Sequence, residues 1–403
     1  MHYLPIHIEI TAQEKTMTAD NKDPATVDSA EVASIHDIGP PPIEDDYVNP
    51  AQNSPRWLLG AHALGLRLMA RLGFHLGNRS GIPSISPTET IWLDSTLSEW
   101  KGKEVISADV WLPPDRHVES SSPSASTSSS SSSSSNENEN GNKKRRRPVV
   151  INFHGGGFIL GQGTDDSRWA NVLVHSLGAV VFSVNYRLSP GYPFPTPVED
   201  CADAILQISR LADKYRFDTD RIVLSGFSAG GTLAMSSWLV LTDPARWNYE
   251  INDPLPKIAG LVLYYPVLDW TLDRPQKRAA CAHPDKTLTS GLTDLIDASY
   301  LHPAIPRRER TDPRLSPGIM PDDLLDKLPP IHLCLCEYDM LLAEGRLFAE
   351  RLEKRGKHIS VRVLEGEKHA WDKPLPLAPK ETVAFEYDIA VAAVKSWFDK
   401  LET

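Results

Sequence analysis

One stretch, RIVLSGFSAGG at Arg221–Gly231, constrains the fold of this chain more than any other. Ile222–Leu224 is a short apolar run typical of a buried parallel strand, and the residues after the stretch begin a helical pattern. Gly226 and Gly230 flank Ser228, and because they lack Cβ, a strand and a helix can pack closely around a sharp turn. The spacing G-x-S-x-G between a strand and a helix indicates a nucleophile elbow, which holds a serine hydroxyl at a strained, exposed turn.

The helix after this turn is expected to assist the serine electrostatically. A helix N-terminus presents unpaired N–H groups and partial positive charge, which favour negative charge developing beside Ser228. A chance Gly/Ser turn would share the five-residue pattern, but it would need neither the strand before it nor the helix after it.

Composition limits the kinds of partner. The chain has 403 residues and a formal net charge of −11, which argues against nucleic-acid binding because phosphate contacts need a basic surface. Four cysteines are too few for a disulfide scaffold, and we expect Cys334 and Cys336 to be buried apolar residues of one strand. The first residues have neither the basic nor the apolar segment of a secretory signal, so we expect an intracellular, cytoplasmic location.

Three segments depart from the pattern of a regular domain, which we expect to span residues 56–403. Residues 1–55 are acidic and rich in proline, which predicts a disordered tail. Residues 118–147 combine a serine tract with the basic run Lys143–Arg147, and they offer too little apolar surface to offset the entropy of ordering. We expect them to form a disordered hairpin loop between strands of one sheet. Residues 271–313 are charged and irregular, and they predict an inserted lid.

The stretch Trp57–Leu76 predicts an amphipathic helix. Leu64, Leu68 and Leu72 share one face of it, and two internal arginines make insertion across a membrane costly. The sequence leaves three interpretations open: an ordinary packed helix, a lid over the site that spans residues 56–80, or a helix that makes peripheral contact with a membrane surface.

Short apolar runs alternate with helical patterns from Pro148 onward. This alternation predicts an α/β fold with a mostly parallel, doubly wound sheet. Strands are expected at Glu89–Ser95, Glu104–Leu112, Val149–Phe153, Ala179–Asn185, Ile222–Leu224, Ile258–Tyr264, Ile331–Cys336 and Ile359–Leu364, and helices at Val198–Tyr215, Gly231–Leu241, Leu342–Arg355 and Glu386–Leu401.

A glycine run, HGGGF at His154–Phe158, directly follows the expected strand Val149–Phe153. Without side chains in the way, its backbone N–H groups can point at a substrate oxygen. A phosphate-binding loop would need a trailing Lys-Ser/Thr, which is absent. Together with the elbow, the run predicts donors that hold an oxyanion during ester hydrolysis.

A serine nucleophile needs a histidine base and a carboxylate that orients the histidine. In a fold built on this elbow the acid precedes the histidine, and both follow the serine. Asp339 and His369 each follow an expected strand, at the carboxyl edge where sites of such sheets form. The competing carboxylates are Glu337, Glu344, Glu365, Glu367 and Asp372, and the competing histidines are His154 and His332.

These motifs together resemble the hormone-sensitive-lipase-like family of α/β hydrolases, which includes carboxylesterases and arylacetamide deacetylases. The resemblance runs from about Val149 to the C-terminus, and it rests on HGGGF at 154–158, VNYRLSP at 184–190, FPTPVED at 194–200, GFSAGG at 226–231, EYDMLLAEG at 337–345 and HAW at 369–371. It implies an α/β-hydrolase fold whose lid is formed by N-terminal helices and an insertion. It also implies activity on short- to medium-chain acyl or acetyl esters, with no metal or organic cofactor.

The resemblance also assigns roles to residues. It implies that Ser228 is the nucleophile, Asp339 the acid and His369 the base. It further implies an oxyanion hole made by Gly156, Gly157 and Ala229, with structural support from His154, Gly155, Tyr186, Arg187 and Asp200. Three positions depart from the family: Phe227 stands where Asp is usual, Ala370 where Gly is usual, and Gly191 where Glu is frequent.

We therefore expect a serine carboxylic-ester hydrolase that acts on a small-molecule ester. Two alternatives belong to other classes: a non-catalytic small-molecule binder on the same fold, and a lipase that works at a membrane surface. The sequence indicates neither the natural ester nor the oligomeric state.

Overall fold

The computed structural model of the chain describes residues 47–77, 83–114, 146–374 and 379–401. The chain divides into a unit of residues 1–43 and a unit of residues 44–403, and every described element belongs to the second unit. The predicted acidic tail is therefore outside the described residues up to residue 46. The predicted serine-rich and basic insert is outside them as well, except for Arg146 and Arg147.

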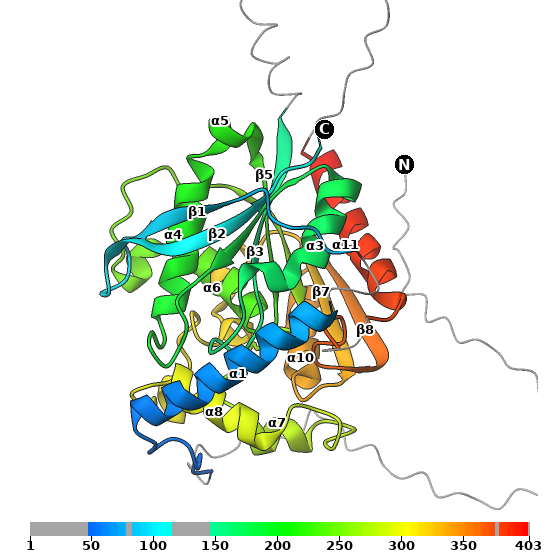
Figure 1. Cartoon of the computed structure of the whole chain (residues 1–403). Helices are drawn as coiled ribbons and strands as arrows, with labels where there is room; N and C mark the ends of the chain where they lie inside the picture. Colours follow the sequence, from blue (N-terminus) through cyan, green and yellow to red (C-terminus); the bar gives the residue numbers. More distant parts are fainter. Residues whose placement is uncertain (1–46, 78–82, 115–145, 375–378, 402–403) are drawn as a thin grey trace, which may run out of the picture. The chain divides into compact units, whose positions relative to one another are not determined.

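A single sheet of eight strands organises the second unit (Figure 1). Its spatial order is β1-β2-β4-β3-β5-β6-β7-β8. β1 and β2 run antiparallel to their neighbours, and all pairings from β4 to β8 are parallel. The strands are β1 Glu89–Ser95, β2 Gly102–Trp111, β3 Arg147–Phe153, β4 Val180–Asn185, β5 Phe217–Phe227, β6 Ile258–Tyr264, β7 Ile331–Tyr338 and β8 Ile359–Lys368.

Helices cover both faces of this sheet, because its strands are apolar on both sides. In β3, Val149 and Ile151 belong to one hydrophobic core, while Val150 belongs to a second core on the opposite face. The first core includes residues of α4 (Thr196–Ser209), α6 (Ala229–Thr242) and α10 (Leu342–Lys354). The second includes residues of α3 (Ser167–Val172) and α11 (Thr382–Asp399). This arrangement confirms the predicted doubly wound, mostly parallel α/β fold.

Two details of the predicted secondary structure are wrong. The strand at 149–153 does not form a hairpin with the strand that precedes it, because β4 lies between β2 and β3 and pairs with both. The helix predicted at Val198–Tyr215 is broken: α4 ends at Ser209, and the short α5 (Ala212–Tyr215) begins after Leu211 takes a non-helical conformation.

Two parts of the chain lie over the carboxyl edge of the sheet. α1 (Arg56–Gly77) packs on α8 (Ser290–Tyr300), and α7 (Arg274–Ala279) lies close by (Figure 1). Residues 47–55, which we assigned to the disordered tail, lie within the described part of the chain. Tyr47 donates a hydrogen bond to the Asp294 side chain at 2.7 Å, and the buried Asn49 amide donates to the Asp294 carbonyl at 2.9 Å.

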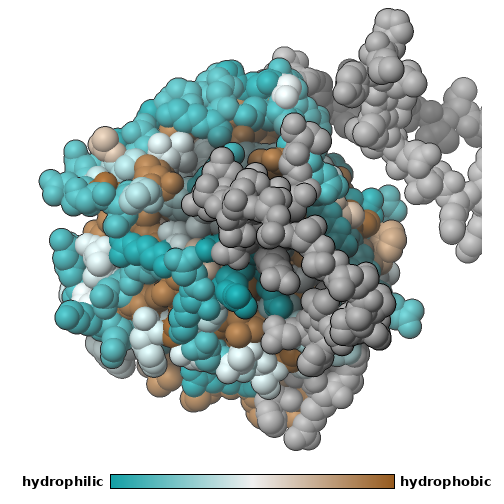
Figure 2. Space-filling model, turned by 90° about the horizontal axis from the view of Figure 1, so that it is seen from above, coloured by the Kyte–Doolittle hydropathy of each residue, from teal (hydrophilic) through white to brown (hydrophobic). Residues whose placement is uncertain are grey.

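The surface of the described unit is mixed in character. On the face shown in Figure 2, hydrophobic residues are dispersed among hydrophilic ones. Over the described ranges, we find no helix with the combination of length and apolar character needed to cross a membrane.

Candidate active site

Ser228 occupies the turn between β5 and α6, and its backbone conformation is strained. Its φ of 52° and ψ of −119° lie outside the regions that L-residues favour. The close approach of strand and helix explains the flanking glycines: a Cβ on Gly230 would overlap the carbonyl of Phe153, and one on Gly226 would overlap the backbone of Gly230. The chain therefore forms the predicted elbow, and it projects the serine beyond the edge of the sheet.

An unbroken series of hydrogen bonds joins the three residues that the sequence placed on separate loops. The Oγ of Ser228 lies 2.8 Å from Nε2 of His369, and Nδ1 of His369 lies 2.6 Å from Oδ2 of Asp339. Asp339 directly follows β7 and is buried, and its Oδ1 accepts the N–H of Leu341 at 3.1 Å. His369 directly follows β8. This is the geometry of a nucleophile, a base and an orienting acid.

Three of the competing side chains make contacts of their own outside this series. Glu337 is the penultimate residue of β7, and its carboxylate accepts the N–H of Gly366 at 2.6 Å. Glu344 forms a buried ion pair with Lys277 at 2.5 Å. His332 is buried within β7, where its Nδ1 lies 3.3 Å from the Ser360 hydroxyl. Each of these groups therefore has a local structural partner away from Ser228.

The glycine loop lies directly against the elbow. Gly155 is so close that a Cβ added to it would be 3.0 Å from the Phe227 carbonyl oxygen. Gly156 has a φ of 117°, and a Cβ there would overlap the carbonyl of Leu160. The N–H groups of Gly156, Gly157 and Ala229 donate to no backbone acceptor within the described residues. These N–H groups remain available to an atom bound beside Ser228.

The predicted support residues contact one another at and near the start of this loop. The buried His154 ring stacks on Tyr186 with centroids 4.3 Å apart, and the Tyr186 hydroxyl donates to the His154 carbonyl at 2.8 Å. Burial lowers the pKa of His154 to about 4, so the ring is neutral. Arg187 forms a buried ion pair with Asp200 at 2.6 Å. Tyr186 thus fixes the start of the glycine loop through His154, and the ion pair fixes Arg187, the next residue after Tyr186.

Ser228 and His369 face a largely apolar cavity of about 210 Å³. Ala70 and Phe74 of α1 form one part of its wall. The predicted lid insertion contributes another part, through Leu288, Leu292 and Ile296. Both segments therefore contribute side chains to the wall of this cavity.

Three lining residues were not singled out from the sequence. Tyr265 has a φ of 39°, and the centre of its ring lies 4.8 Å from that of His369. Asp165 brings a carboxyl group to the cavity, and burial, with a further contribution from Asp166, raises its pKa to about 7. The half-buried Lys373 forms ion pairs with the buried Asp166 and Asp372. None of the three lies in a recognisable motif, so only their position after a strand or loop could have pointed to them.

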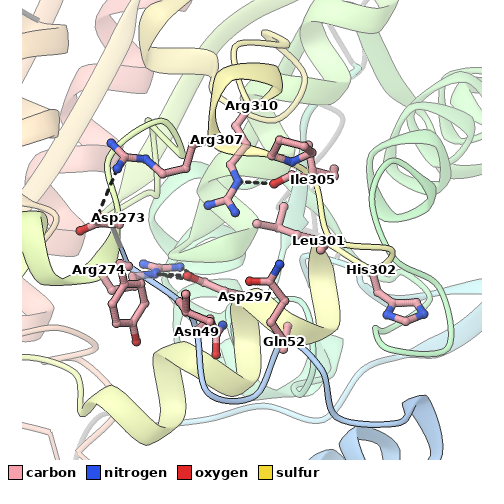
Figure 3. A pocket seen from close by; sticks show the side chains of 15 residues that line it. Asn49, Gln52, Asp273, Arg274, Asp297, Leu301, His302, Ile305, Arg307 and Arg310 are labelled. Atoms are coloured by element: carbon pink, nitrogen blue, oxygen red, sulfur yellow. Dashed lines mark hydrogen bonds and ion pairs between the residues drawn. The ribbon is translucent and has the colours of Figure 1, made fainter. Parts of the chain in front are cut away.

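A second cavity, of about 160 Å³, lies between residues 47–52 and the lid insertion (Figure 3). Two ion pairs lie in its wall: Arg274 binds Asp297 at 2.6 Å, and Arg307 lies 3.2 Å from Asp273. Ser228 and His369 do not line it. We therefore place the candidate active site at the first cavity.

Comparison with known proteins agrees with this fold. A family model described as alpha/beta hydrolase fold matches residues 150–373. An AB hydrolase superfamily protein of Schizosaccharomyces pombe is 28% identical over 227 residues, which cover 55% of this chain and 62% of that protein, less than two thirds of its length. An arylesterase of Saccharolobus solfataricus is 31% identical over 224 residues, covering 55% of this chain and 68% of the arylesterase.

A solved structure extends the similarity beyond the matched sequence. A thermostable carboxylesterase cloned from a metagenomic library superposes with a TM-score of 0.63 at 25% identity. The superposition covers 83% of this chain and 97% of the carboxylesterase.

Proposed function

The chain belongs to the alpha/beta hydrolase fold family, and on this basis we propose that it is a serine carboxylic-ester hydrolase. The observation that carries the proposal is the continuous hydrogen-bonded series from the Ser228 hydroxyl through His369 to Asp339 at the wall of an apolar cavity. The similarity to an arylesterase and a carboxylesterase supports the same reaction class.

Acylation starts when the Oγ of Ser228 forms a bond to the acyl carbon and Nε2 of His369 takes the hydroxyl proton. Asp339 holds the Nδ1–H of the ring and stabilises the imidazolium. As the tetrahedral intermediate collapses, its ester C–O bond breaks, and His369 delivers the proton to the leaving alkoxide oxygen. A water molecule, deprotonated by the same ring, then attacks the acyl-enzyme. The carboxylic acid leaves, and Ser228 regains its proton.

The open N–H groups of Gly156, Gly157 and Ala229 stabilise the oxyanion in both tetrahedral intermediates. Loss of one such donor typically reduces kcat by about 10²–10³-fold, because the donors act in a site from which water is largely excluded. The backbone supplies these donors, so their position depends on the conformation of the loop.

The cavity favours acyl or alcohol groups of small to medium size. Its volume of about 210 Å³ and its apolar lining suit short alkyl or aryl groups better than an extended chain. Two acidic residues, Asp165 and Asp166, also line the wall near Lys373, and Asp165 would contact a hydroxyl or amino substituent of a substrate.

A series of p-nitrophenyl esters, from acetate to palmitate, tests this proposal. We expect the highest kcat/KM for short and medium chains, and we expect Ser228→Ala to have no turnover above background. Ser236→Ala is a matched control, because this buried serine of α6 has no hydrogen-bond partner within the described residues. A folded wild-type protein that binds esters without hydrolysing any of them would contradict the proposal, and it would favour a binding protein.

A further inference from the structure

The outward side of α1 carries a row of six apolar side chains. They are between 45% and 73% exposed, whereas Leu59 and Ala63 on the opposite side are fully buried. At about 100° per residue the six lie within less than half of the helix circumference. The row, called here the α1 outer face, consists of Trp57, Leu64, Leu68, Met69, Leu72 and Leu76.

The inward side of the same helix is firmly attached to the active-site region. Arg67 donates to the carbonyls of Ile159 at 2.7 Å and Ser189 at 2.9 Å. Arg56 donates to the carbonyl of Pro190 at 2.7 Å. These bonds fix the rotation of α1 about its axis, so the outer face points away from the sheet.

The charged side chains of α1 are all basic. Its 22 residues include three arginines and neither Asp nor Glu, although the whole chain has a net charge of −11. The exposed Arg71 and His62 flank the outer face along its two edges. Such a helix, with an apolar stripe bordered by basic residues, is suited to the boundary between lipid headgroups and acyl chains.

We propose that the α1 outer face docks the protein on an anionic phospholipid surface, with the helix axis parallel to it. The six apolar side chains enter the acyl boundary, and Arg71 and His62 remain at the level of the headgroups. A protein partner of ordinary composition would meet the same apolar row, but the absence of carboxylates over the full length of α1 favours an anionic surface.

Docking in this orientation places the active-site cavity next to the lipid. Ala70 and Phe74 contribute the opposite side of α1 to the cavity wall beside Ser228. Lipophilic esters dissolved in the surface would therefore reach the cavity through a path along α1. This last step rests on the proposed esterase function, whereas the docking itself does not.

Sedimentation of the full chain with vesicles tests the docking. The vesicles contain phosphatidylcholine alone or phosphatidylcholine with phosphatidylserine, at low and high salt. We expect binding to be stronger with phosphatidylserine and weaker at high salt. The triple variant Leu64→Ser, Leu68→Ser and Leu72→Ser should lose binding by about tenfold or more, because most of the buried apolar area is removed.

A matched triple variant controls for general loss of surface hydrophobicity. Leu255→Ser, Leu347→Ser and Phe385→Ser replace residues that are 44%, 47% and 61% exposed elsewhere on the surface, and they should leave vesicle binding unchanged. Turnover of p-nitrophenyl acetate without vesicles should be the same in both triple variants, which separates docking from catalysis. A wild type that binds vesicles but hydrolyses no ester would contradict only the proposed function.

Two results would overturn the docking proposal. The first is equal vesicle binding by the wild type and the α1 triple variant. The second is a wild-type dimer in analytical ultracentrifugation that binds no vesicles and becomes monomeric in the α1 triple variant. The outer face would then be an interface between copies of the chain.

Discussion

The ammonium group of Lys373 lies 3.4 Å from the centre of the Phe227 ring, one residue before the proposed nucleophile. The same group binds Asp372 at 2.6 Å and Asp166 at 3.1 Å. Burial opposes the charge of Lys373, but the two carboxylates outweigh it and raise its pKa above the ordinary value. One cation, the half-buried Lys373, therefore connects the elbow, the loop that carries His369 and the segment after the glycine loop.

Lys373→Met should destabilise the protein strongly, because it leaves two buried carboxylates without their cation. We expect a loss of about 3–5 kcal/mol in the free energy of unfolding, measured with urea. Lys380→Met is a suitable control. Lys380 forms an exposed ion pair with Glu367, and its loss should cost about 1 kcal/mol or less. Equal effects of the two substitutions would mean that the buried network contributes little to stability.

Asp339→Asn should reduce kcat by several orders of magnitude. An amide permits the wrong histidine tautomer and does not stabilise the imidazolium; the corresponding change in a serine protease costs about 10⁴-fold. Glu337→Gln should cost far less, because this carboxylate accepts a backbone N–H instead of contacting His369. Stopped-flow or steady-state kinetics on p-nitrophenyl butyrate compares the two variants. If Glu337→Gln is the more damaging change, Asp339 is not the acid.

Gly156→Ala should abolish activity while the protein still folds. The added Cβ would overlap the carbonyl of Leu160 at a φ of 117°, so the loop must shift and its N–H groups lose their alignment. Gly178→Ala is a matched control with a positive φ of 66° and open space around the new Cβ. It should cost about 1 kcal/mol of stability and leave kcat unchanged. A Gly156→Ala variant with near-normal kcat would exclude this loop from the oxyanion hole.

Acid should destabilise the protein in part through His332. Burial, with a smaller contribution from Arg362, lowers the pKa of this histidine to about 4 from an ordinary value of 6.5. Between these values the unfolded chain binds a proton that the native state does not, so stability falls as the pH decreases through that window. His332→Leu should make the fall shallower in urea titrations at pH 7 to pH 4, while the contribution of His154 remains. An unchanged slope would show that His332 titrates normally in the fold.

Sequence periodicity predicted the bounds of a strand correctly where the apolar pattern matches the burial of the strand. The strands at Glu89–Ser95 and Ile258–Tyr264 have the predicted bounds. Asp339 and His369 could be placed because each follows a buried strand directly, and parallel strands bring their carboxyl ends to one edge.

Tertiary contacts determine the features that the sequence did not reveal. The place of β4 between β2 and β3 depends on which strands pair, and their apolar patterns are alike. Lys373 reads as an ordinary surface lysine beside Asp372, and only the fold brings Asp166 and Phe227 to it. Phe227, which stands where the family usually has Asp, therefore has a structural role in this chain: its aromatic ring contacts the ammonium group of Lys373.

The most direct test of the central claim is to locate the acyl group during turnover. The wild-type protein is mixed with p-nitrophenyl butyrate, quenched with acid within milliseconds and digested, and the acylated peptide is identified by mass spectrometry. We predict a butyryl group on Ser228, appearing with the first burst of p-nitrophenol and lost as water completes the cycle. Ester hydrolysis with the acyl group on another residue, or with no acylated peptide at any quench time, would contradict Ser228 as the nucleophile.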